Sequence, residues 1–218
     1  MPTRKPLPPK QKQAEKTRGE KKSGGLFRGP TPEKAIQTVS IGEGLGPYIE
    51  TQAKKFPNRK YVAVDPAYKG VRTLHRDYAK RLEDLGAGVR AKEAVPAVEQ
   101  LIREGYKVRH FNVDMPNMPL RGEERQYAIE KFGFDRFLRK AKKVLLPNGK
   151  VYFTSEVPEY LEAIAELARE AGYKTRALGR QQNLQKSSFI GRTIRNVRPV
   201  FRLECTFGLK EAGRLPRK

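Results

Sequence analysis

The sequence contains few of the residues from which disulfides and metal centres are built. It has one cysteine, Cys205, and two histidines, His75 and His110, in 218 residues. One cysteine excludes an internal disulfide and any metal site built from several cysteines. Two histidines leave little material for a zinc site. We therefore expect no metal, and a reducing, cytoplasmic setting.

Long apolar runs are also missing. No stretch approaches the roughly 20 apolar residues that a helix needs to cross a bilayer. The N-terminus lacks the apolar segment of a secretory signal. We therefore expect a chain without a membrane-spanning part.

Acidic residues are scarce relative to basic ones. The chain has 46 Lys and Arg against 24 Asp and Glu, a formal net charge of +22 and a pI near 10.2. Such an excess repels itself unless it meets a polyanion, which favours a nucleic acid as the partner. An anionic membrane surface is the second alternative, but no basic amphipathic helix with a strong apolar face supports it. A generic solvated basic surface is the third.

The first 30 residues differ in composition from the rest. Residues 1–30 hold nine Lys and Arg, two Glu and almost nothing apolar. Such a segment cannot bury a core, so we expect a flexible basic arm that tethers nucleic acid. A merely solubilising tail is the alternative. Residues 31–218 then form one domain.

Residues 31–218 alternate between strand and helix patterns. Several apolar runs are short, and the helical stretches between them are about a dozen residues long. This alternation predicts an α/β fold with a doubly wound, mostly parallel sheet and helices on both faces. The last two strands follow each other closely and predict an antiparallel pair at the C-terminus. The expected strands are 35–42, 60–65, 89–94, 108–114, 150–156, 174–180 and 199–208, and the expected helices are 47–56, 71–86, 95–106, 123–145 and 158–173.

Three glycines at alternate positions follow the first expected strand, in VSIGEGLGPY at residues 39–48. The turn after the first strand of a doubly wound sheet is a usual ligand site, and glycine lets the backbone approach a ligand closely. Asp65 ends the next strand, 19 positions after Gly46. That is the place of the acid that binds ribose hydroxyls. A glycine-rich turn with a surface aspartate is the alternative.

The spacing within this loop bears on the identity of the ligand. Pro47 stands where G-x-G-x-x-G needs its third glycine, and no G-K-[ST] follows, so a nicotinamide dinucleotide and a P-loop phosphate are both disfavoured. The spacing G-x-G-x-G, with an acid at the end of the next strand, resembles the Rossmann-like S-adenosylmethionine-dependent methyltransferases. The resemblance implies S-adenosylmethionine as the cofactor.

The same resemblance implies roles for single residues. The glycines would cradle the cofactor, one acid would bind its ribose, another its adenine amino group, and a third its ammonium. The glycines are Gly42, Gly44 and Gly46. Asp65 would bind the ribose, Glu93 the adenine amino group and Glu43 the ammonium. The segment DMPN supplies Asp114, Pro116 and Asn117 at the expected active site, where a short polar stretch can orient a nucleophilic nitrogen. The alternative is that Asp114 only caps the next helix.

The order of segments after Asp114 resembles the tRNA guanine-N7 methyltransferase family. That family has D-P-W-P after strand four, then a P-G-G turn and a strand ending in T-D before a helix with E-Y. This chain has DMPN, then PNG, then Thr154-Ser155-Glu156 before PEYLEAI, and the resemblance runs from about residue 39 to about residue 205. It implies catalytic roles for Asp114, Pro116, Asn117, Thr154 and Glu156.

The chain departs from that family where the base would be recognised. It has no tryptophan at all, and Ser155 stands in place of the aspartate, for which Glu156 could substitute. Ser187 and Ile190 replace the threonine and glutamate of T-x-x-E, and Ser40 replaces the acid before the first glycine. The methylated base therefore stays open.

The C-terminal stretch is basic. Residues 174–218 hold twelve Lys and Arg against two Glu. Arginine contacts phosphates and stacks on bases, so we expect Arg192, Arg195 and Arg198 to contact RNA. Phe201 and Phe207 alternate with charged residues, as core-facing residues of a strand would.

The leading hypothesis is an S-adenosylmethionine-dependent methyltransferase that acts on a base nitrogen of tRNA or rRNA. A non-catalytic RNA- or ribosome-binding protein that retains the fold is the alternative. Methylation of a protein or a small molecule is a third hypothesis, which the charge disfavours.

Overall fold

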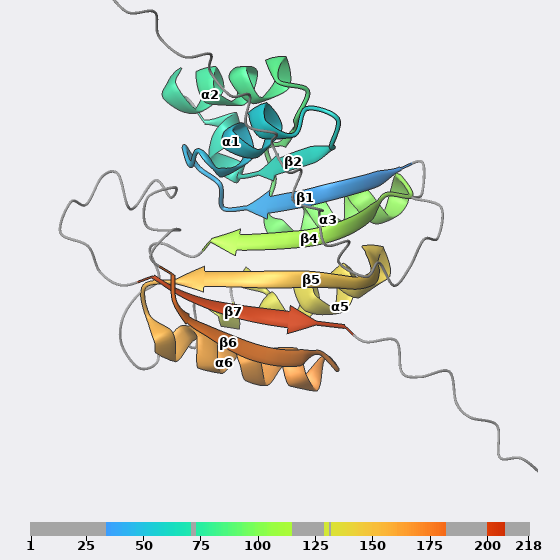
Figure 1. The fold of residues 1–218 in the computed structure, drawn as a ribbon, viewed down its shortest axis with the longest axis vertical. Helices are drawn as coiled ribbons and strands as arrows, with labels where there is room; N and C mark the ends of the chain where they lie inside the picture. The colour runs from blue at the N-terminus through green and yellow to red at the C-terminus, as the bar shows by residue number, and fades with distance from the viewer. Residues whose placement is uncertain (1–33, 71–72, 115–128, 131, 182–199, 208–218) are drawn as a thin grey trace, which may run out of the picture. The chain divides into compact units, whose positions relative to one another are not determined.

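The computed structural model describes residues 34–70, 73–114, 129–130, 132–181 and 200–207. These residues form an α/β fold around one seven-stranded sheet (Figure 1). The strands are β1 (Ala35–Ile41), β2 (Tyr61–Val64), β3 (Gly88–Arg90), β4 (Lys107–Asp114), β5 (Leu145–Ser155), β6 (Lys174–Arg180) and β7 (Phe201–Thr206). The helices are α1 (Tyr48–Lys55), the 3-10 turn η1 (Pro66–Lys69), α2 (Thr73–Asp84), α3 (Ala94–Arg103), α5 (Phe134–Val144) and α6 (Pro158–Glu170).

The strand order is β3-β2-β1-β4-β5-β7-β6. Strands β1 to β5 pair in parallel, and β7 lies antiparallel to both β5 and β6. The predicted fold class and the antiparallel C-terminal pair are thereby confirmed. The strand order reverses between β1 and β4, which is where doubly wound sheets bind their ligands.

Helices cover the two faces of the sheet unequally. On one face, α3, α5 and α6 pack on the buried side chains of β4 and β5, including Phe111 and Phe153. On the other face, α1 and α2 form a smaller cluster with β2, through Ile49, Tyr78 and Leu82. In Figure 1, α3 and α5 lie behind the sheet, and α1 and α2 lie at its β2 end.

The helices α5 and α6 follow directly from their sequence period. Each has buried residues three and four positions apart, a single apolar stripe that must face a core. Burying one large apolar side chain contributes roughly 1.5–3 kcal/mol, so these stripes hold both helices on the sheet. The buried residues are Phe134, Phe137, Leu138, Ala141 and Val144 of α5, and Tyr160, Leu161, Ile164, Ala165 and Ala168 of α6.

Two predicted boundaries were wrong. The strand expected at residues 89–94 covers only Gly88–Arg90. It lies at the edge of the sheet, and its pairing with β2 ends at Arg90. Strand β5 was expected to start after the PNG turn, yet Leu145 already pairs with Val108. The register shifts before pairing resumes at His110 and Lys150, so the turn interrupts the strand instead of preceding it.

Three other predictions concern a membrane span, the N-terminal arm and the helix before β5. Within the described residues, no helix is long and apolar enough to span a membrane. Residues 1–30, expected as a basic arm, lie outside the described part of the chain. So do residues 123–128 and 131 of the helix expected at 123–145, whose C-terminal half is confirmed as α5.

Candidate functional site

The glycine loop is packed against the end of β4. Gly42 has φ +75°, and a Cβ on it would lie 2.6 Å from the carbonyl oxygen of Asp114. A Cβ on Gly46 would lie 2.7 Å from the carbonyl oxygen of Glu43. Both distances are shorter than any real contact of a Cβ. The glycines thus allow the loop to close tightly between β1 and α1.

Glu43 holds this loop from inside. Its side chain is buried, its carboxylate accepts a hydrogen bond from the backbone N–H of Ile49 at 2.9 Å, and it also hydrogen-bonds the hydroxyl of Ser40. Because Pro47 offers no side-chain cap, this carboxyl caps the first turn of α1. Burial raises the pKa of Glu43 to about 8. The carboxyl of Glu43, predicted to meet an ammonium group, is thus used within the loop and does not line the cavity described below.

Asp65 ties the loop to the end of β2. One carboxylate oxygen accepts from the backbone N–H of Gly44 at 2.9 Å, and the other accepts from that of Ala67 at 2.8 Å, which caps η1. An ionised carboxylate has about four acceptor sites, so two remain for a ligand. The side chain is therefore fixed in place and still able to accept.

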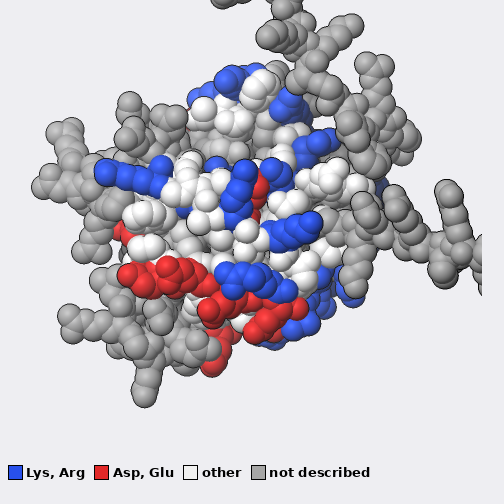
Figure 2. Space-filling view, turned by 60° about the horizontal axis from the view of Figure 1, so that its bottom comes forward, with Lys and Arg blue, Asp and Glu red and all other residues white. Residues whose placement is uncertain are grey.

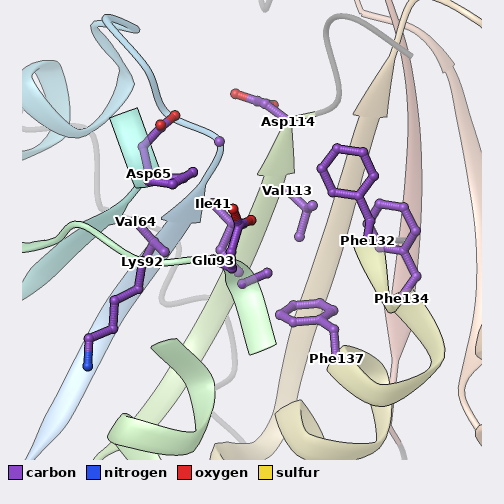
Figure 3. Close-up of a pocket in the computed structure, with 13 residues that line it drawn as sticks. Ile41, Val64, Asp65, Lys92, Glu93, Val113, Asp114, Phe132, Phe134 and Phe137 are labelled. Carbon is purple, nitrogen blue, oxygen red and sulfur yellow. The ribbon is translucent and has the colours of Figure 1, made fainter. Parts of the chain in front are cut away.

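A cavity of about 270 Å³ opens at the carboxyl ends of β1, β2 and β4 and at the start of α3 (Figure 3). Four residues that the sequence predicted as cofactor-binding or catalytic line it: Gly42, Asp65, Glu93 and Asp114. The other lining residues are Ile41, Val64, Pro66, Lys92, Ala94, Val113, Phe132, Phe134 and Phe137.

The cavity has an acidic side and an aromatic side. In Figure 3, Asp65 and Glu93 lie across from the rings of Phe132, Phe134 and Phe137, and the Lys92 side chain extends away from them. Glu93 occupies the N-cap position of α3 and not a strand end. The walls between the two sides are aliphatic. Such a cavity suits a ligand with a flat apolar ring and a polar sugar.

Asp114 ends β4 beside the glycine loop. Burial raises the pKa of its carboxyl to about 6, against the opposing effects of nearby Arg202 and of a hydrogen bond with Thr154. Asp114, Thr154 and Arg202 are register partners across β4, β5 and β7. Two of the predicted catalytic residues, Asp114 and Thr154, are therefore brought together.

Arg202 was missed from the sequence. Its guanidinium lies 3.9 Å from the centre of the Tyr152 ring, and its Nη2 donates to Oδ1 of Asn112 at 2.9 Å. The signal that could have found it is the alternation in FRLECT, which puts Arg202 on the face opposite to buried Leu203. The aromatic side of the cavity was also missed.

The remaining predicted residues do not join the cavity. Glu156 follows β5, is partly exposed and is not a lining residue. Ser155, which stands in place of the family's aspartate, is buried and accepts a hydrogen bond from the N–H of Val157 at the start of α6. Pro116, Asn117, Arg192, Arg195 and Arg198 lie outside the described residues. Among the described residues, no group of three or more His, Cys, Asp or Glu side chains could hold a metal ion.

Known proteins share sequence and fold with this chain. No family model matches the chain. The tRNA (guanine-N(7)-)-methyltransferase of Syntrophotalea carbinolica is 31% identical to it over 141 residues. The matched part is 63% of this chain and 58% of that protein, so the chain spans somewhat more than half the length of this relative.

Solved structures share the architecture. A methyltransferase homologue from Pyrococcus horikoshii matches 81% of this chain and 63% of its own, with a TM-score of 0.56 and 14% identity. The 16S rRNA (adenine(1408)-N(1))-methyltransferase of Catenulisporales acidiphilia, solved with its cosubstrate SAM, matches 83% of this chain and 88% of its own. Its TM-score is 0.53 at 14% identity. The chain thus has the Rossmann-like methyltransferase fold and resembles a divergent tRNA guanine-N7 methyltransferase in sequence.

Proposed function

We propose that this chain is an S-adenosylmethionine-dependent methyltransferase that acts on a base nitrogen of RNA. One observation carries the proposal: the cavity at the switch point of a methyltransferase fold is lined by Gly42, Asp65, Glu93 and Asp114. These residues come from four separate segments of the chain. Each stands where the motif resemblance expects a cofactor-binding or catalytic residue.

The lining residues fit the proposed cofactor. Aliphatic and aromatic walls suit an adenine ring, and the two free acceptor sites of Asp65 suit vicinal ribose hydroxyls. Glu93 can accept a hydrogen bond from an amino group of the adenine. The backbone of Gly42 lines the same space, and the N–H of Gly44 holds Asp65 in place. When bound, the cofactor supplies a methyl group on a sulfonium, an electrophile that a nitrogen lone pair can attack.

The chain's own contribution to the reaction is positioning. Methyl transfer is an in-line displacement, and holding the reactants in line supplies much of the rate. Asp114 lies at the mouth of the cavity, and Thr154 and Arg202 restrain its carboxyl. That carboxyl can accept a hydrogen bond from an N–H of the target base and turn the reacting nitrogen toward the methyl group. A ring nitrogen with a free lone pair needs no general base.

RNA is the proposed substrate for two reasons. The net charge of +22 favours a polyanion, and the relative described above is named for tRNA and one structural neighbour for 16S rRNA. We propose that the basic arm of residues 1–30 and the arginines Arg192, Arg195 and Arg198 add phosphate contacts. The choice between tRNA and rRNA stays open, and the cytoplasm is the proposed compartment.

Two measurements test this proposal. Calorimetry with S-adenosylmethionine should show saturable binding, and no binding at millimolar ligand would refute the cofactor assignment. Incubation with methyl-labelled cofactor and total cellular RNA should label an RNA band, whose nucleosides then identify the base. Label in protein but not in RNA would refute the substrate assignment.

The second candidate function is a non-catalytic RNA-binding protein that retains the cofactor. It is favoured by Ser155, whose hydroxyl accepts from the N–H of Val157 ahead of α6 where the family presents an acid, and by Glu156, which lies outside the cavity. The same pair of measurements separates the two functions. Cofactor binding without label transfer to any RNA would favour the second.

A further inference from the structure

One part of the sheet lacks a helical cover among the described residues. The face of β4, β5 and β7 that is opposite to α3, α5 and α6 is in view in Figure 1, and no described helix lies over it. We call it the β4–β5–β7 face. Its side chains form three rows across the strands: His110–Lys150–Thr206, Asn112–Tyr152–Glu204 and Asp114–Thr154–Arg202.

These rows are polar, which is unusual for this position in the fold. Strands of a parallel sheet with both faces covered are apolar almost throughout. Strand β2 follows that rule, with four buried residues. Strand β4 instead alternates, with Phe111 and Val113 buried toward α3 and α5 and polar residues on the other face. Asn112 and Glu204 on that face are buried, but Lys150, Tyr152, Thr154 and Arg202 are partly exposed. Through these partly exposed side chains the β4–β5–β7 face can meet a polar partner.

The centre of this face is a stacked pair with unused hydrogen-bonding capacity. The guanidinium of Arg202 lies over the Tyr152 ring, 3.9 Å from the ring centre. Among the described residues, Nε of Arg202 and Nδ1 of His110 are buried without a hydrogen-bond partner. Burial and the neighbouring cations lower the pKa of His110 to about 4, so this ring is neutral at physiological pH.

Cations surround the stacked pair. Lys150 and Arg176 both pair with Glu204, at 2.8 and 3.0 Å, and Lys174 is the register partner of Thr206 on the same face. The face therefore carries four cations, counting Arg202, and two acids, Glu204 and Asp114. Figure 2 brings the lower edge of Figure 1 forward and shows a row of basic side chains, with acidic ones gathered mostly below it. The exposed glutamates of α6 are Glu159, Glu162, Glu166 and Glu170.

We propose that the β4–β5–β7 face binds the single-stranded RNA that flanks the target nucleotide. The inference rests on the RNA part of the proposed function and names the surface that serves it. Bases stack on aromatic rings and on guanidinium planes, and basic side chains follow the phosphates. The Tyr152–Arg202 pair supplies the stacking platform, and Lys150 and Arg176 supply the phosphate contacts. The row that ends in Asp114 joins this face to the cavity, so one strand of RNA can reach both.

The test compares variants of the face with a matched variant behind the sheet. Tyr152→Leu removes the ring, and the double variant Lys150→Gln/Arg176→Gln removes two cations of the face. Lys140→Gln/Lys143→Gln removes two cations of α5, where Lys140 pairs with Glu99 at 2.9 Å as Lys150 pairs with Glu204. Binding is measured by fluorescence anisotropy, with a labelled single-stranded RNA of mixed sequence and with bulk tRNA as competitor.

We expect Tyr152→Leu to weaken binding about tenfold, the usual effect of removing one stacking side chain. The Lys150→Gln/Arg176→Gln variant should lower the slope of log affinity against log salt by about 1.4, or about 0.7 for each single-strand phosphate contact. The α5 variant should stay within about twofold of the unaltered protein. Zero-length photocrosslinking with 4-thiouridine RNA should label peptides of β4, β5 or β7.

Several results would overturn the proposal. Unchanged affinity and salt slope in both face variants would do so, as would an equal loss in the α5 variant or crosslinks confined to other segments. An unaltered protein that binds neither RNA probe would overturn it in favour of an acidic protein partner. Thermal unfolding checks that each variant folds, and Arg176→Gln alone serves as a second variant because two thirds of that side chain is exposed.

Failure of the RNA-binding surface can be told apart from failure of the proposed methyltransferase function. If the face variants lose RNA binding while no RNA is methylated, the surface stands and the catalytic proposal fails. If RNA is methylated and the face variants bind normally, the surface proposal fails alone. Calorimetry with S-adenosylmethionine on each variant shows whether the cavity itself is intact.

Discussion

The buried carboxyl of Glu43 should make the stability of this fold depend on pH, and replacement by glutamine should remove that dependence. The side chain is 3% exposed and bonded to Ser40 and to the N–H of Ile49. Glutamine has the same shape. Its carbonyl can accept from Ile49, and its amide can donate to Ser40. Glu43→Gln therefore keeps the packing and removes only the ability to ionise.

The magnitude follows from the two pKa values. Burial raises the pKa of Glu43 to about 8 in the folded protein, against an ordinary value of 4.5. Between these values the folded state holds a proton that the unfolded state has lost, so the free energy of unfolding falls as pH rises through this window. The stabilisation is complete below pH 4.5 and is gone above pH 8. One unit corresponds to about 1.4 kcal/mol, so the whole effect is at most about 5 kcal/mol.

Urea unfolding of both proteins at several pH values from about 5 to about 9 measures this difference. Near pH 5 the unaltered protein should be as stable as Glu43→Gln or more so, and near pH 9 the variant should be more stable by several kcal/mol. Glu99→Gln is the control, since the pKa of exposed Glu99 is lowered by Lys140 and the group stays ionised across the range. Parallel stability profiles for the unaltered protein and Glu43→Gln would refute the reasoning.

Three further predictions concern the cavity. Gly42→Ala should cost more stability than Gly86→Ala, because both positions have φ +75° but only at Gly42 does the added Cβ meet a backbone oxygen, at 2.6 Å; equal losses in thermal unfolding would contradict the close approach. Asp65→Ala should weaken S-adenosylmethionine binding by roughly 1–3 kcal/mol in calorimetry, since it leaves polar partners unpaired; an unchanged affinity would remove the ribose assignment. Methyl transfer should fall as pH drops below about 6, where Asp114 becomes protonated, and Asp114→Asn should lack this limb of the pH profile; a variant that keeps the limb would assign it to another group.

The elements of this fold could be predicted because their signals are local. The helix α6 is predicted by apolar residues three and four positions apart and by Pro158 at its first position. The strands β2 and β4 are short runs bounded by turn residues. Asp65 and Gly42 follow from spacing alone, and the structure brings both to one cavity.

The parts that could not be predicted depend on contacts between distant segments. Tyr152 and Arg202 stack because β7 inserts between β5 and β6, an order that no local pattern specifies. The contacts of Glu43 within the loop could not be predicted from the loop sequence. Only the folded chain shows that Ile49 and Ser40 enclose it. The short β3 likewise depends on its neighbour, which offers three pairings.

Ser40 departs from the motif that the glycine loop resembles, and its contact with Glu43 gives a physical reason for this departure. The methyltransferase families that this loop resembles carry an acid at that position, and here a hydroxyl replaces it. The carboxyl of Glu43, three residues on, reaches back and hydrogen-bonds this hydroxyl, so a carboxyl still lies beside position 40. It differs from a free acid because burial keeps it protonated near neutral pH. This buried acid therefore supports the loop from inside, while the acids that line the cavity are Asp65, Glu93 and Asp114.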